Sequence, residues 1–104
     1  MKVKNLISNR SGEAVRNQFV IEDTQNNTIY FQSYESTVAK VNDDGLTLGG
    51  DWDYSNTTLK WLYVFLREYA YKYYCLIEDN YSKLCKATIE KAITENLIEY
   101  DYNL

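Results

Sequence analysis

The feature that most constrains the fold is a change of hydrophobic period halfway along the chain. Before Gly49 and Gly50, β-branched and aromatic residues form short runs separated by Asn, Asp and Gly, a pattern typical of β-strands and turns. From Leu59 to Tyr74, apolar residues recur at spacings of mostly three and four, as they do on one face of a helix. The chain therefore predicts a sheet followed by helices, which is an α+β order.

The first half divides into short strands at its turn residues. A hairpin is the clearest prediction there, because an Asn-rich segment separates two β-branched and aromatic runs and Asn tolerates left-handed backbone. A second strong turn signal is Asn42-Asp43-Asp44-Gly45. The predicted strands are Asn17–Thr24, Thr28–Tyr34, Thr37–Val41 and Leu46–Leu48, with Val3–Ile7 as an optional short strand before them.

Two helices and a final strand are predicted in the second half. Ser55 or Thr57 is expected to cap the first helix, with Trp52 packed beneath its start, since hydroxyl side chains satisfy the free N–H groups of a first turn. The second helix is predicted over Ser82–Ile93. Apolar and polar residues then alternate, so Ile98–Leu104 is predicted to be a strand of the sheet.

Length and composition indicate a single domain over residues 1–104. The composition is 45% hydrophobic, which suffices for a core without disulfides or metals. The predicted fold is a single α+β domain. It has an antiparallel sheet of four to five strands, the last one C-terminal, and two helices packed on one face.

The net charge of the chain limits the kinds of partner that it is expected to bind. The formal net charge is −4 and the pI is near 4.7, so direct binding to the phosphate backbone of a nucleic acid is disfavoured. The start of the chain has no apolar run of the length that a signal peptide or a membrane span needs. A cytoplasmic protein is therefore expected.

Residue types also argue against an enzyme. The chain contains no His, the side chain most used for acid–base catalysis and metal binding. Its two cysteines, Cys75 and Cys85, are too few for a zinc site and are expected to be free thiols in a reducing compartment. No catalytic residue and no cofactor is predicted.

One acidic segment resembles the beginning of a calcium loop. Asp51, Asp53 and Ser55 occupy its first three ligand positions, but the sixth and twelfth positions hold Asn56 and Leu62 instead of Gly and Glu. The segment is therefore interpreted as an acidic lead-in to a helix, where carboxylates meet the positive end of the helix dipole. No metal site is predicted.

The most unusual segment is Tyr69–Tyr74, which holds four tyrosines in six residues. One face of a helix cannot bury that many rings, and tyrosine is favoured at interfaces because it buries a large area and keeps a polar tip. Two interpretations stay open, a broad core seam and a face that binds a protein or a second copy of the chain.

Three strings resemble a group of small, uncharacterised phage and mobile-element proteins. Asn17–Ile21 is similar to an N-Q-F-I-I strand of that group, Phe31–Tyr34 to an F-Q-S-Y strand, and Trp52–Thr58 to a W-D-Y-S-x-T-T helix start. The resemblance covers roughly residues 5–67, and the chain departs from the group after Leu66. It implies an origin in a bacteriophage or other mobile element, and it carries over no activity.

Small acidic proteins of that origin often inhibit host defence, so the resemblance implies a non-enzymatic inhibitor, with an anti-CRISPR acting on an effector nuclease complex as the first candidate. The expected partner is a host protein with a basic nucleic-acid groove in the bacterial cytoplasm, toward which an acidic surface is steered. A structural or housekeeping phage protein that self-associates through its Tyr-rich helix is the alternative. The residues expected to contact the partner are Asp51, Trp52, Asp53, Tyr54, Tyr71, Tyr74, Glu78 and Asp79.

Overall fold

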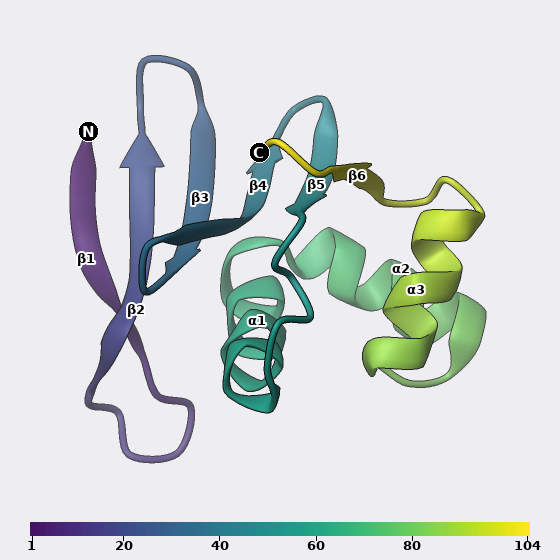
Figure 1. Cartoon of the computed structure of the whole chain (residues 1–104), viewed down its shortest axis with the longest axis horizontal. Helices are drawn as coiled ribbons and strands as arrows, with labels where there is room; N and C mark the ends of the chain where they lie inside the picture. The colour runs from purple at the N-terminus through teal and green to yellow at the C-terminus, as the bar shows by residue number, and fades with distance from the viewer.

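Five strands follow one another directly along the chain, and three helices and a short last strand complete the fold. The computed structural model describes all residues, 1–104 (Figure 1). The strands are β1 (Lys2–Ile7), β2 (Ala14–Asp23), β3 (Thr28–Ser33), β4 (Ser36–Asn42), β5 (Gly45–Gly49) and β6 (Glu99–Asp101). The helices are α1 (Asn56–Tyr69), α2 (Tyr71–Tyr81) and α3 (Lys86–Thr94).

The six strands form one sheet in sequence order. Neighbours from β1 to β5 are antiparallel, as expected for strands joined by short turns, whereas β6 lies parallel to β5. The segment between β5 and β6 contains all three helices. A pair of parallel strands requires a long connection of this kind. The predicted α+β class is confirmed. The sheet has six strands instead of four to five, its last strand is parallel rather than antiparallel, and there are three helices instead of two.

A row of paired residues across the middle of the sheet forms the floor of the core. Val20 pairs with Phe31, Phe31 with Ala39, and Ala39 with Leu48, and all four side chains are fully buried. The ring of Phe65 on α1 stacks on Phe31 with the centroids 5.4 Å apart. Burying side chains of this size stabilises the fold by about 1.5–3 kcal/mol each, so this contact fixes α1 over β3 and β4.

The start of α1 is where the sequence predicts it. Ser55 is the N-cap, and its Oγ accepts a hydrogen bond from the backbone N–H of Thr58 at 3.1 Å. Thr57 lies exposed in the first turn, so it is not the cap. Trp52 is only 5% exposed and belongs to the same core cluster as Leu59 of α1.

The first predicted helix is in fact two helices. Ala70 has backbone angles of φ −135° and ψ 44°, which end α1, and α2 begins at the next residue. The change of direction lets the tyrosines occupy separate environments. Tyr69 stacks on Phe65 at 5.5 Å, while Tyr71 and Tyr74 stack on each other at 5.8 Å. The crowding of rings in Tyr69–Tyr74 is therefore resolved by the break in the helix.

The second predicted helix begins later than Ser82. That residue adopts a left-handed conformation (φ 74°) and ends α2. Cys85 is the N-cap of α3, and its backbone N–H donates to Thr88 Oγ1 at 2.9 Å. The apolar periodicity of the sequence continues through the segment before Cys85, so it does not indicate the first residue of α3.

The predicted C-terminal strand exists but is shorter than Ile98–Leu104. Ile98 is buried, Glu99–Asp101 form β6, and the chain then turns back as Leu104 N–H donates to the carbonyl of Asp101 at 3.1 Å. Gly49 and Gly50 leave room for this turn, because a Cβ on Gly49 would lie 3.3 Å from the Cβ of Leu104 and one on Gly50 3.0 Å from the ring of Tyr102.

The cap of α1 gives a test with a matched control. Ser55→Ala is expected to lower the free energy of unfolding by about 1 kcal/mol, because the N–H of Thr58 loses its acceptor. Thr57→Ala, in the exposed first turn, is expected to change it by less than about 0.5 kcal/mol. Urea unfolding followed by circular dichroism measures both. Equal losses in the two variants would show that Ser55 is not the cap.

Candidate functional site

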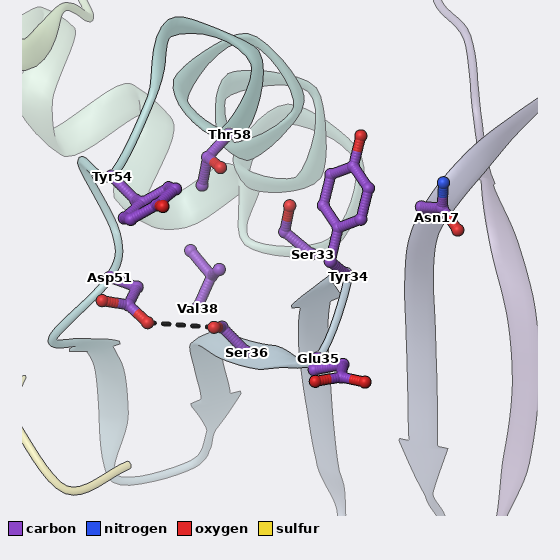
Figure 2. A pocket seen from close by; sticks show the side chains of 9 residues that line it. All are labelled: Asn17, Ser33, Tyr34, Glu35, Ser36, Val38, Asp51, Tyr54 and Thr58. Atoms are coloured by element: carbon purple, nitrogen blue, oxygen red, sulfur yellow. Dashed lines mark hydrogen bonds between the residues drawn. The ribbon is translucent and has the colours of Figure 1, made fainter.

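The largest hollow of the molecule lies between the β3–β4 turn and the start of α1. Its volume is about 670 Å³, within the range of about 300–1,000 Å³ found for ligand sites. Figure 2 shows Tyr34 and Tyr54 on opposite sides of it, with Ser33 and Val38 between them. The lining residues are Asn17, Ser33, Tyr34, Glu35, Ser36, Val38, Asp51, Tyr54 and Thr58.

Two residues on the rim have left-handed backbone. Tyr34 is the first residue of the tight β3–β4 turn and has φ 54°, and Asn17 in β2 has φ 64°. The backbone N–H of Tyr34 donates to the carbonyl of Asn17 at 2.7 Å, which ties the two together. Asn adopts this conformation readily, but a large aromatic residue does so at a cost of about 1–3 kcal/mol. Such strain is concentrated at functional sites.

The floor of the hollow contains a buried hydroxyl group without a partner. Ser33 is only 4% exposed and its Oγ makes no hydrogen bond. Gln18, which pairs directly with Ser33 across β2 and β3, is 1% exposed and its Oε1 also lacks a donor. Leaving a buried polar atom unpaired costs about 1–3 kcal/mol. The two residues that carry these unpaired atoms are therefore cross-strand neighbours, one of them in the lining of the hollow.

The charge of the hollow is negative. Asp51 accepts a hydrogen bond from Ser36 Oγ at 2.9 Å (Figure 2), Glu35 lies at the rim, and no Lys or Arg lines the hollow. A smaller hollow of about 180 Å³ adjoins it, shares Ser36 and Asp51, and adds the exposed ring of Tyr102. We call the two together the acidic hollow. It combines exposed aromatic rings with carboxylates.

The predicted contact residues near α1 separate into three environments. Asp51 and Tyr54 line the acidic hollow, and Tyr54 is 80% exposed. Trp52 is buried in the core, where it packs beneath the helix start as predicted, so it is not available for the predicted contact with a partner. Asp53 does not line the acidic hollow, and its carboxylate forms an ion pair with Lys86 Nζ at 3.8 Å.

The other predicted contact residues lie on α2, away from the acidic hollow. Tyr71 is exposed and stacks on Tyr74, whose hydroxyl accepts a 3.4 Å hydrogen bond from Arg67. Glu78 is half-buried and Asp79 is exposed. The 14 residues of α1 span about 21 Å and separate this group from Tyr54. The structure therefore does not bring the predicted residues together into one site.

A third hollow, of about 300 Å³, has the opposite charge. It lies between the β1–β2 loop and the side of α1, and Arg10, Lys60 and Arg67 line it without any acidic residue. The two ion pairs of the structure, Lys4–Glu22 and Lys86–Asp53, involve none of these bases. The surface charge is thus segregated, which would orient a charged partner as it approaches.

Titratable groups with displaced pKa values lie outside the acidic hollow. A hydrogen bond from Thr88 lowers the pKa of the Cys85 thiol, and a hydrogen bond to Cys75 raises the pKa of Tyr71. Hydrogen bonding to Glu95 raises the pKa of Tyr81. No three His, Cys, Asp or Glu side chains are grouped so that they could hold a metal ion. None of the helices combines the length and the apolar character needed to cross a bilayer.

The sequence missed most of the hollow. The sequence predicts Ser33 and Tyr34 within a strand and Glu35 and Ser36 between two strands, and it indicates no contact role for any of the four. The signal that could have found them is the spacing of the two strands, since a two-residue connection places Tyr34 at a turn position with left-handed backbone. The turn lies beside Asp51 and Tyr54 only because of the tertiary packing, and no local sequence pattern predicts that contact.

The comparisons place the chain in a family. Residues 1–90 match the model of a family of unknown function, DUF8033. The chain belongs to this DUF8033 family. No curated protein and no solved structure gives a significant match. The nine residues of the larger hollow lie within the matched part, whereas Tyr102 of the smaller hollow lies beyond it.

The unpaired hydroxyl of Ser33 gives a second test. Ser33→Ala is expected to raise the free energy of unfolding by about 1 kcal/mol, because it removes a buried polar atom that has no partner. Ser36→Ala is the control and is expected to lower it by about 0.5–1.5 kcal/mol, because Ser36 donates to Asp51. Chemical denaturation measures both. A loss of stability in Ser33→Ala would show that its hydroxyl is satisfied.

Proposed function

We propose that this protein works by binding another protein through the acidic hollow rather than by catalysing a reaction. The observation that carries the proposal is the composition of this surface. Tyr34, Tyr54 and Tyr102 are 56%, 80% and 77% exposed, and they surround carboxylates with no basic residue among them. Exposed tyrosines and a charged rim are typical of protein-binding sites.

The charge of the hollow indicates the class of partner. Carboxylates beside aromatic rings complement a surface rich in Lys and Arg, and they speed its encounter with the protein. Basic surfaces of this kind line the grooves of nucleic-acid-handling proteins. The net charge of −4 acts in the same direction over longer distances.

The particular partner that we propose is a host defence protein, with a CRISPR effector nuclease complex as the first candidate. This step rests on the resemblance of Asn17–Ile21, Phe31–Tyr34 and Trp52–Thr58 to small phage and mobile-element proteins. By occupying the basic groove, the protein would keep nucleic acid out of it. The site of action would be the cytoplasm of the bacterial host.

The alternative function is self-association through α2. The observation that favours it is the exposed ring of Tyr71, stacked on Tyr74 at the far end of α1. Tyr74 is already in contact with Arg67, whose guanidinium carbon lies 5.2 Å from the centre of its ring. Only one ring of the pair is thus freely available to a second copy, and the acidic hollow offers more exposed aromatic surface.

Charge reversal in the hollow tests the proposed function. The double variant Glu35→Lys/Asp51→Lys is expected to slow association with the effector at least tenfold at low salt and to relieve inhibition of nucleic-acid cleavage. The control with an equal change of charge is Asp44→Lys/Glu90→Lys, at two exposed residues outside the hollow, one in the β4–β5 turn and one in α3. Surface plasmon resonance and a cleavage assay provide the measurements.

Two results would contradict the proposal. Parent protein that neither binds nor inhibits any effector of its host, and that sediments as a stable dimer, would favour the structural alternative. Equal effects of the hollow and control variants would mean that binding depends on net charge alone and not on this surface.

A further inference from the structure

We infer that the acidic hollow binds a guanidinium group, supplied by an arginine side chain of the partner. This inference rests on the proposed function and goes further by naming the group that enters the site. The hollow lies between two exposed tyrosines and contains the carboxylate of Asp51. It also has an unpaired, buried hydroxyl group in its floor, that of Ser33.

The arrangement of the rings fits a flat cation. Tyr34 stands on the β3–β4 turn and Tyr54 on the segment before α1, and Figure 2 shows the two on opposite sides of Ser33 and Val38. A cation held near the face of a tyrosine ring is attracted by the ring quadrupole. A guanidinium group also stacks on such faces, because it is planar and weakly hydrated.

The polar atoms of the hollow favour arginine over lysine. Asp51 uses one carboxylate oxygen for Ser36, and carboxylate oxygens have further lone pairs that can accept hydrogen bonds. The Ser33 hydroxyl becomes a second acceptor once it rotates about its Cα–Cβ bond toward the hollow, because its oxygen is inaccessible in the free protein. A guanidinium group has five N–H donors in a fixed fork and can serve acceptors in different directions, whereas an ammonium group is a compact point charge.

The same inference explains why unfavourable features persist at this position. The left-handed conformation of Tyr34 and the unpaired hydroxyl of Ser33 both cost stability in the free protein. A guanidinium group in the hollow would give a donor to the Ser33 hydroxyl, once that hydroxyl has rotated toward it, and would pack against the ring of Tyr34. The unfavourable features of the free chain thus become contacts of the complex.

The experiment uses the full chain and two small ligands. N-acetylarginine amide is titrated into labelled protein, and N-acetyllysine amide is the matched control of equal charge. We expect the arginine compound to shift the NMR signals of Tyr34, Tyr54 and the Ser33 backbone amide, with an affinity at least threefold above that of the lysine compound. Asp51→Asn is expected to weaken arginine binding about tenfold, as the loss of a charge-assisted hydrogen bond does.

Asp53→Asn is the control variant, because Asp53 pairs with Lys86 outside the hollow, and it is expected to leave arginine binding unchanged. Equal binding of the two ligands, or shifts confined to other acidic residues such as Asp79, would overturn the inference. If arginine fails to bind while complex formation with the effector still depends on Asp51, the guanidinium assignment is wrong and the proposed function stands. If arginine binds and no effector does, the proposed function fails and the site remains.

Discussion

The fold depends on the contact between the central row of the sheet and α1. Val20, Phe31, Ala39 and Leu48 come from four consecutive antiparallel strands and form one buried row. Phe65 stacks on Phe31 in the middle of that row. The contact determines the height and direction of α1 over the sheet, and through them the position of both ends of the helix.

The acidic hollow is a consequence of this contact. Because α1 is held over β3 and β4, its capped start places Tyr54 and Thr58 beside the β3–β4 turn. The turn then contributes Tyr34 in a strained conformation, and the end of β3 contributes Ser33 with an unpaired hydroxyl. A total stability of about 5–15 kcal/mol is typical for a domain, so two such costs are tolerated only because the core beneath is well packed. The rigid core thus supports a strained, polar site at its edge.

Much of the fold could be predicted from the sequence, because it follows from local patterns. The Asn- and Asp-rich turns separate the strands, and Ser55 precedes the apolar period of α1. The break at Ala70 could not be predicted, since alanine favours helices and the apolar period continues through it. The end of the last strand at Asp101 could not be predicted either, since the alternation of apolar and polar residues continues through the turn that packs Leu104 against Gly49.

The candidate site was predicted only in part, for a related reason. Acidic and aromatic composition marked Asp51 and Tyr54, but composition cannot distinguish an exposed ring from the buried one of Trp52. Ser33 and Tyr34 acquire their properties from a register and a backbone angle, and neither property is encoded in residue type. The group on α2 was expected to act together with Asp51, yet α1 holds the two apart.

In our proposal, the strained turn at Tyr34 lowers the free energy of unfolding and in exchange places the tyrosine ring for binding. The most direct test is to measure the free energy of unfolding and the binding of N-acetylarginine amide on one variant, Tyr34→Asn. Asn accepts the left-handed backbone of this position without the strain of a large side chain. We expect this variant to be at least as stable as the parent and to bind the arginine compound several-fold more weakly. A variant that is clearly less stable, or that binds as the parent does, would contradict the proposal.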